Sequence, residues 1–176
     1  MNLIVTSSRH LEDEAAQEIT TILESLGDNN STINITNLSG IVTCNTTLEP
    51  FLVIKKIQEK ILEEPWSMRY CHRIIPVQET VVTEKQNIVN SVLNHVKIMK
   101  NEDTYRITVE KRHSAISTKE IIDAIADKIA NKVSLEKFDW IILIEILGNK
   151  TGISILKETD ILSTQKLKRS LSEEDG

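Results

Sequence analysis

The sequence predicts an α+β protein made of two modules, and two observations support this prediction. Segments with apolar residues at helical spacing alternate with short runs of β-branched residues, which favour strands. Charge also differs along the chain: residues 1–64 hold four Lys or Arg and ten Asp or Glu, whereas residues 65–157 hold 14 and 11. An asymmetry of this kind indicates two modules with different roles. At 176 residues the chain is long enough to bury a core in each.

The first module is expected to contain six elements in the order βαββαβ, which is the ferredoxin-like arrangement. Gly27 stands where the first helix would stop, and Ser39-Gly40 suits a hairpin turn between two strands. Pro50 is tolerated in the first turn of the second helix, and Pro65 ends that helix. The expected elements are residues 3–6, 11–26, 32–38, 41–45, 50–64 and 70–77.

The second module is expected to follow the order αβαββ. Thr83-x-x-Gln86 and Ser117-x-x-Glu120 match the capping box that opens a helix. Residues 148–152 form a turn between a nearly all-apolar strand and the last strand. The expected elements are residues 84–99, 105–110, 118–129, 140–147 and 153–156.

These patterns predict three regions. Residues 1–77 form an N-terminal ferredoxin-like domain and residues 78–160 form a second domain. Residues 161–176 form a polar, partly disordered tail, with disorder expected over residues 172–176.

The N-terminal sequence contains no basic leader and no long apolar region, so we expect no secretory signal. The longest apolar run, residues 140–147, is far shorter than the ~20 residues that a membrane span needs. Cys44 and Cys71 lie far apart and do not form a metal-type pair. Free thiols in a reducing, cytoplasmic setting are therefore expected.

The sequence offers no convincing active site. The five glycines form neither a dinucleotide-binding loop nor a phosphate-binding loop, and the four histidines are scattered. Cys71 and His72 are adjacent in an expected strand, so their side chains point to opposite faces and cannot act as a nucleophile–base pair. His95 lies near an apolar helical face, which is typical of a structural residue. We expect no catalytic residues, no metal site and no cofactor.

Two stretches, residues 65–77 and 104–113, concentrate Arg, Lys and His among apolar and aromatic residues in a chain of net charge −5. Local positive charge in an acidic protein favours an anionic partner, and nucleic acid is the first candidate. Ordinary ion pairs of these cations, for instance with Glu79 or Glu110, are the alternative. Lys119 is included because it lies near the free N–H groups at a helix start. The candidate RNA contacts are Arg69, Arg73, Arg106, Lys111, Arg112 and Lys119.

Together these residues resemble a known family. The order of elements, the bridge PWSMRYCHRIIPV, the strand TYRITVEKRH and the hairpin IILIEILGNKTGISIL are similar to a THUMP domain preceded by its N-terminal ferredoxin-like domain. More narrowly, the chain resembles the stand-alone THUMP proteins that assist the tRNA cytidine acetyltransferase. The moderate matches that carry the resemblance, in order, are Ser39-Gly40, Glu63 to Trp66, Arg69-Tyr70, Arg73, Pro76, Thr104 to Arg112, and Gly152 to Ser154.

The resemblance implies a THUMP-type second module and a non-catalytic adaptor that binds tRNA, often near its acceptor end. Its expected partners are tRNA and a tRNA-modifying enzyme, most specifically one that forms N4-acetylcytidine. Tyr70 and Trp66 could stack on bases, although packing is favoured for Trp66. Three alternatives stay open: an RNA-binding subunit for tRNA methylation or thiolation, a scaffold that binds only protein through its acidic first module, and a small enzyme with an unusual site.

Overall fold

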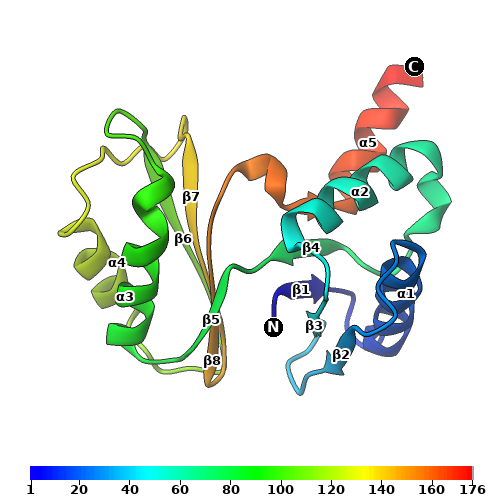
Figure 1. Ribbon diagram of the computed structural model, residues 1–176, viewed down its shortest axis with the longest axis horizontal. Coiled ribbons are helices and arrows are strands. Elements are labelled where there is room, and N and C mark those ends of the chain that lie inside the picture. The colour runs from blue at the N-terminus through cyan, green and yellow to red at the C-terminus, as the bar shows by residue number, and fades with distance from the viewer. Residues whose placement is uncertain (176) are drawn as a thin grey trace. The chain divides into compact units, whose positions relative to one another are not determined.

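The computed structural model describes residues 1–175, and it describes side chains as far as Glu174. The chain divides into two compact units (Figure 1). The first consists of Met1–Pro76 together with Thr159–Gly176, and the second is Val77–Glu158. The prediction of an α+β protein with two modules is confirmed. Among residues 1–175, no helix combines the length and the hydropathy that a membrane span requires.

The first unit is a five-stranded antiparallel sheet in the order β2-β3-β1-β4-β9, with helices packed on it. The predicted βαββαβ order is present in its first 76 residues. Pro50 is at the start of α2, and the Glu49 side chain caps this helix by accepting from the N–H groups of Phe51 and Leu52. The elements are β1 (Leu3–Thr6), α1 (Glu12–Ser25), β2 (Thr32–Ile35), β3 (Ile41–Asn45), α2 (Pro50–Glu63), the 3₁₀ turn η1 (Pro65–Ser67), β4 (Arg73–Pro76), β9 (Leu162–Ser163) and α5 (Thr164–Asp175).

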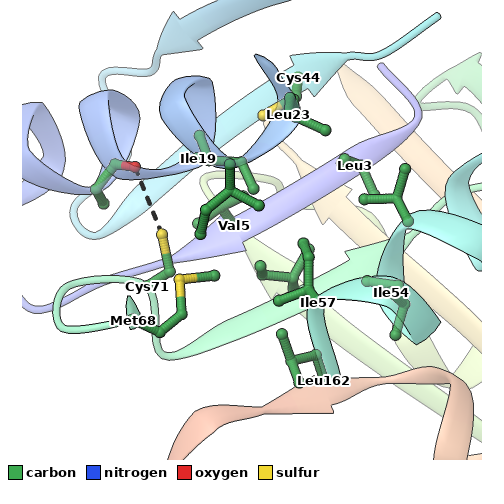
Figure 2. Close-up of a cluster of buried hydrophobic side chains, with 14 of the residues drawn as sticks. Leu3, Val5, Ile19, Leu23, Cys44, Ile54, Ile57, Met68, Cys71 and Leu162 are labelled. Atoms are coloured by element: carbon green, nitrogen blue, oxygen red, sulfur yellow. Dashed lines mark hydrogen bonds between the residues drawn. The ribbon is translucent and has the colours of Figure 1, made fainter. Parts of the chain in front are cut away.

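The core of the first unit lies between this sheet and the helices (Figure 2). Leu3 and Val5, two residues apart on β1, both point into it, as side-chain alternation along a strand requires. α1 contributes Ile19 and Leu23, and the Cys71 thiol donates to the backbone carbonyl of Ala15 over 3.5 Å. Burial of each large aliphatic side chain stabilises the fold by about 1.5–3 kcal/mol.

The C-terminal segment differs from the polar tail that the sequence predicts. Residues 162–163 pair with β4 as strand β9, and Thr164–Asp175 forms helix α5. Leu162 is buried in the core of the first unit, and Leu167 packs against it. The amphipathic spacing of Thr164, Leu167 and Leu171 is the signal for this helix, although few apolar residues carry it. Gly176 lies outside the described residues.

The second unit is a four-stranded sheet in the order β5-β8-β7-β6, in which only β6 and β7 run parallel. Helices α3 and α4 supply the apolar side chains that pack with those of the sheet. The β7–β8 hairpin is nearly all buried, as its apolar sequence indicates. The elements are β5 (Glu79–Val82), α3 (Lys85–His95), the 3₁₀ turn η2 (Val96–Ile98), β6 (Tyr105–Arg112), α4 (Thr118–Ala126), β7 (Trp140–Leu147) and β8 (Lys150–Leu156), and the 3₁₀ turn η3 (Glu158–Asp160) follows.

Of the two predicted capping boxes, the N-cap at Ser117 is confirmed and the N-cap at Thr83 is wrong. The Ser117 hydroxyl accepts from the Glu120 N–H at the start of α4. At the start of α3 the N-cap residue is Glu84, and the Thr83 hydroxyl instead pairs with the Thr151 hydroxyl at 2.8 Å. Thr83 directly follows β5, a strand that was not predicted from the sequence. The pairing of β5 with β8 places Thr83 next to Thr151 of β8.

Candidate nucleic-acid interface

The cations that the sequence nominates for RNA binding are divided between the two units. Arg69 and Arg73 belong to the first unit. The others belong to the second unit and are Arg106, Lys111, Arg112 and Lys119. Each unit therefore carries some of the candidate RNA contacts.

Arg69 lies in a rigid turn, defined here as the basic turn (residues 68–72). The Glu18 carboxylate on α1 accepts hydrogen bonds from three successive backbone N–H groups, those of Arg69 (2.9 Å), Tyr70 (3.1 Å) and Cys71 (3.0 Å). The Arg69 side chain is exposed, and its guanidinium carbon lies 5.7 Å from the centroid of the Tyr70 ring. Because the backbone is already ordered, a ligand of Arg69 would have to order only the side chain.

The C-terminal helix holds the same turn from a second side. The Lys168 ammonium donates to the Met68 carbonyl over 2.5 Å, and the Thr164 hydroxyl donates to the Cys71 carbonyl over 3.1 Å. The Thr164 N–H donates to the His72 carbonyl over 2.9 Å. The basic turn thus depends on residues about 50 positions before it and about 95 after it, and sequence patterns do not reveal such contacts.

Arg73 is the first residue of β4, directly after the basic turn. It lies between Thr6 of β1 and Ser163 of β9, and its N–H donates to the Thr6 hydroxyl over 3.1 Å. Within the described residues its guanidinium makes no hydrogen bond or ion pair, and the side chain is half-buried. The structure therefore brings Arg69 and Arg73 into one short segment of the first unit.

Arg106 lies at the opposite end of β6 from Lys111 and Arg112. A strand advances about 3.3 Å per residue, so the six-residue separation of Arg106 and Arg112 corresponds to roughly 20 Å. The Arg106 guanidinium donates to the Leu135 carbonyl over 3.3 Å and lies over the Phe138 ring at 5.9 Å. Arg106 is therefore placed with the loop before β7, away from the other two cations of its strand.

Lys111 and Arg112 both contact other parts of the second unit. The Lys111 ammonium donates to the Ile116 carbonyl over 3.0 Å. The Arg112 guanidinium lies 3.2 Å from a carboxylate oxygen of Glu145, whose side chain is only 2% exposed. The alternative that these cations form ordinary ion pairs thus applies to Arg112. Its partner is Glu145, and not Glu110, which is closer to it in the sequence.

Lys119 is highly accessible to solvent. It lies in the first turn of α4, where its ammonium forms an exposed i,i+4 pair with Asp123 at 3.7 Å. The Lys119 side chain is 89% exposed. Exposed pairs of this kind are weak, so Lys119 can exchange Asp123 for another anion at little cost.

An acidic hollow adjoins the basic turn in the first unit. Its volume is about 570 Å³, and its lining holds three carboxylates, those of Glu14, Glu18 and Glu64, against one cation, Lys60. Trp66, also in the lining, is 71% exposed, which differs from the packing role favoured in the sequence analysis. Arg69 therefore lies beside negative charge, which would weaken its attraction for a phosphate.

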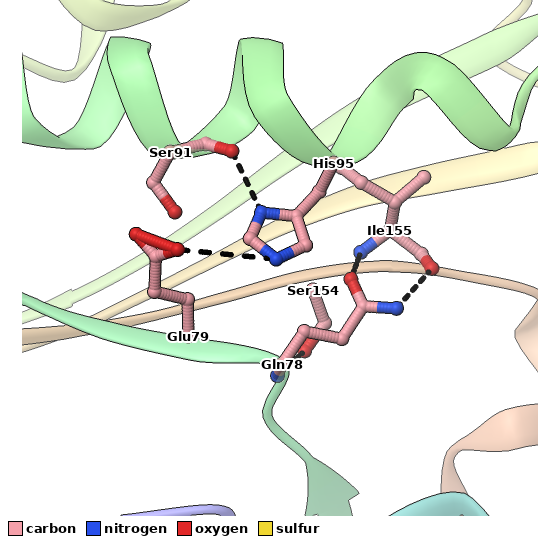
Figure 3. Close-up of polar contacts among 6 residues, drawn as sticks. All are labelled: Gln78, Glu79, Ser91, His95, Ser154 and Ile155. Carbon is pink, nitrogen blue, oxygen red and sulfur yellow. Dashed lines mark hydrogen bonds and ion pairs between the residues drawn. The ribbon is translucent and has the colours of Figure 1, made fainter.

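A serine, a histidine and a glutamate lie close together in the second unit (Figure 3). The His95 Nδ1 faces the backbone carbonyl of Ser91 at 2.8 Å, and its Nε2 lies 3.9 Å from the Glu79 carboxylate. The buried Ser91 hydroxyl has no hydrogen-bond partner among the described residues, so it is not coupled to His95. His95 is half-buried and has polar neighbours, which fits the structural role that the sequence predicts.

The neighbouring Gln78 has a structural role in the same unit. Its amide pairs with both backbone groups of Ile155, because Oε1 accepts from the N–H over 2.8 Å and Nε2 donates to the carbonyl over 3.3 Å (Figure 3). The Gln78 N–H also donates a hydrogen bond to the Ser154 hydroxyl over 3.2 Å. These bonds extend the pairing of β5 with β8 by one residue.

The two cysteines are buried and free. Burial raises the pKa of the Cys44 thiol to about 12 and also raises the pKa of Cys71, so neither has the character of a reactive thiolate. In the part of the chain that the structure describes, no three His, Cys, Asp or Glu side chains are grouped so as to hold a metal ion.

Residues 86–156 match the model of the THUMP domain. No curated protein matches the chain. The fold is shared with several solved structures, which show 8–18% sequence identity to this chain.

Three of these structures illustrate the likeness. PH1313 from Pyrococcus horikoshii Ot3 has a TM-score of 0.65 at 18% identity, over 89% of this chain and 55% of its own. A 4-thiouridine synthetase in complex with RNA and ATP has a TM-score of 0.53 at 8% identity, over 93% of this chain and 42% of its own. A possible methylase from Clostridium difficile 630 has a TM-score of 0.53 at 18% identity, over 88% of this chain and 40% of its own.

This chain therefore spans about half the length of the structures it resembles, or less. The family match lies entirely within the second unit, Val77–Glu158, and runs from α3 to the end of β8. The order αβαββ expected for a THUMP-type module is present in that interval. The chain carries a THUMP domain at residues 86–156.

Proposed function

We propose that this protein binds tRNA and takes part in tRNA modification. The THUMP domain at residues 86–156 is the observation that carries the proposal. A 4-thiouridine synthetase that shares the fold was solved in complex with RNA, which supports the same reading. Exposed Arg69 and Lys119, together with Lys111, supply cations for phosphate groups.

We further propose that the protein is an adaptor without catalytic activity of its own, acting in the cytoplasm. It would present tRNA to a separate enzyme, most specifically the acetyltransferase that forms N4-acetylcytidine. The resemblance to stand-alone THUMP proteins supports this role, as does the lack of an aligned nucleophile and base at Ser91 and His95. Two buried free cysteines fit a reducing compartment.

Filter binding of folded tRNA tests the RNA-binding part of the proposal. The test variant combines Arg69→Glu, Arg73→Glu and Lys111→Glu. It leaves Arg112 intact, because reversing Arg112 would place a second carboxylate beside the buried Glu145. A matched control reverses three exposed lysines outside the candidate interface, Lys56, Lys85 and Lys128.

We expect the test variant to bind at least roughly tenfold more weakly than the wild type at physiological salt, and the control to bind nearly as well as the wild type. Equal affinity of test variant and wild type would contradict the assigned surface. A wild-type protein that does not bind tRNA would contradict the proposed function itself.

Reconstitution tests the adaptor role. A tRNA cytidine acetyltransferase is incubated with tRNA and an acetyl donor, with and without this protein, and N4-acetylcytidine is quantified by mass spectrometry. We expect product to increase when the protein is added. Product formed by the protein without the acetyltransferase would contradict a non-catalytic role, and no increase would favour methylation or thiolation as the partner reaction.

A scaffold that binds only protein is the second candidate function. The acidic hollow with exposed Trp66 favours it, because an indole ring and carboxylates together attract cationic side chains of another protein. The ultraviolet spectrum of the purified protein distinguishes the candidates. Co-purified RNA raises absorbance at 260 nm relative to 280 nm, and a scaffold without RNA contact would show the spectrum of protein alone.

A further inference from the structure

The loop between β1 and α1 is locked against the turn between β2 and β3. The Ser7 N–H donates to the Gly40 carbonyl over 2.9 Å, and the Gly40 N–H donates to the Glu12 carboxylate over 2.8 Å. Gly40 has a φ of +71°, and a Cβ atom at this position would lie 2.6 Å from the Ser7 carbonyl oxygen. Only glycine permits this close approach, so the two loops form one rigid unit.

This lock positions an exposed arginine. The Arg9 Nε–H donates to the Ser39 hydroxyl over 3.1 Å, which bridges the two loops. The following residue, His10, is also exposed and has a φ of +71°, a conformation that costs free energy in residues other than glycine. The terminal nitrogens of Arg9 have no protein partner within the described residues, so four N–H donors face outward.

The basic turn and β4 bring further polar groups to the same end of the sheet. The His72 N–H donates to the Thr6 carbonyl over 2.8 Å, and the His72 ring nitrogen lies 3.4 Å from the Ser8 hydroxyl. Arg73 pairs with Thr6, three residues before Arg9. Four segments of the first unit thus place two arginines, a histidine and two serine hydroxyls at one sheet end.

The chemistry of this group matches a phosphate. A guanidinium presents a planar fork of donors to phosphate oxygens. The Ser39 oxygen accepts from Arg9, so its own O–H remains available to donate. Glu12, the carboxylate closest in sequence, is already bonded to the Gly40 N–H. The acidic hollow is lined by Glu14, Glu18 and Glu64 and does not include Arg9 or Arg73.

We infer that Arg9, Ser39, His72 and Arg73 form a binding site for backbone phosphates of RNA at the end of the five-stranded sheet. This inference rests on the proposed tRNA binding and deepens it, because it assigns a phosphate site to the acidic unit. The sequence does not mark Arg9 as a candidate, because it is a single cation shortly before three acidic residues at positions 12–14. The feature that makes it a candidate is its placement at the same end of the sheet as Arg73, which only the fold provides.

Filter binding of folded tRNA at several salt concentrations tests the site with Arg9→Glu. The control is Lys56→Glu, an equal charge change at an exposed position on α2 of the same unit. We expect Arg9→Glu to weaken tRNA binding by roughly fivefold at physiological salt and to reduce the slope of log affinity against log salt by about one. Lys56→Glu is expected to leave both quantities unchanged. Arg9→Gln, which keeps a polar side chain, should show a smaller loss in the same direction.

Each result has a distinct meaning. If wild type binds tRNA and both Arg9 variants bind like wild type, the site is overturned while the proposed function stands. If Arg9→Glu and Lys56→Glu weaken binding equally, general charge repulsion explains the effect and the site is again overturned. If the wild type does not bind tRNA, both the site and the proposed function are overturned. Thermal unfolding verifies that each variant is folded, and if Arg9→Glu is not, Arg9→Gln decides the outcome.

Discussion

The end of β6 in the second unit and the end of β1 in the first unit both carry cations, but they use them differently. Arg112 is committed to a carboxylate that is almost completely buried, and Lys111 to a backbone carbonyl. Arg9 uses one N–H on the Ser39 hydroxyl and leaves the rest of its guanidinium exposed. A basic run in a sequence therefore does not distinguish cations that hold a domain together from cations that are available to a ligand.

The largest expected effect is the loss of stability in Arg112→Ala. The Arg112 side chain is 31% exposed, but its removal takes the countercharge from the almost completely buried Glu145 carboxylate, so we expect the second unit to lose about 3 kcal/mol in free energy of unfolding. Trp140 lies in that unit and Trp66 in the other, so urea unfolding followed by fluorescence in a Trp66→Phe background reports on the second unit.

The control for this prediction is Arg9→Ala, which should change stability by less than about 0.5 kcal/mol, because Arg9 is exposed. It is measured in a Trp140→Phe background, which leaves Trp66 to report on the first unit. Equal losses in the two variants would remove the distinction between structural and available cations.

Carboxylates, like cations, can be charged groups that stabilise the fold. Asp28→Asn tests such a carboxylate in the first unit. Burial opposes ionisation of Asp28, but hydrogen bonds from Thr46, Thr47 and Asn30 outweigh it and lower its pKa from 3.8 to about 2. We expect Asp28→Asn to cost roughly 2 kcal/mol at neutral pH, because a pKa shift of one unit corresponds to about 1.4 kcal/mol.

The pH dependence has a definite sign. Since the folded-state pKa of Asp28 is depressed, its contribution is complete above about pH 4 and is lost as the pH falls toward 2. Unfolding of wild type and Asp28→Asn is compared at pH 7 and pH 2.5. The difference between the two proteins should shrink at the lower pH, and an unchanged difference would mean that the charge of Asp28 does not stabilise the fold.

The smallest stability effect is expected at Lys119. Its pair with Asp123 is exposed, so Lys119→Ala should change the free energy of unfolding by less than about 0.5 kcal/mol. If Lys119 contacts a phosphate, the same variant should bind tRNA roughly threefold more weakly. Lys128→Ala, at another exposed lysine of the second unit, is the control and should leave binding unchanged. An unchanged affinity in Lys119→Ala would assign this residue to the solvated helix surface.

Local sequence patterns predicted the helices and strands better than they predicted the contacts between distant residues. The Ser117 cap and the apolar β7 were predictable because their signals lie within a few neighbouring residues. The pairing of Arg112 with Glu145 was not, because 33 residues separate them and Glu145 looks only like a break in an apolar run. β5 was missed although ETVV holds three β-branched residues, because the stretch is only four residues long and lies directly before a predicted helix. Its pairing with β8 is a contact with residues about 70 positions later in the chain.

The arrangement of the first unit has a consequence for synthesis on the ribosome. Thr164 and Lys168, which bond the carbonyl groups of the basic turn, follow the whole second unit in the chain. When residues 1–76 have emerged, Glu18 is present to hold the turn, but β9 and α5 have not yet been made. The second unit is therefore complete as a continuous stretch of chain before the first, and the Arg69–Arg73 segment acquires its final geometry only late in translation.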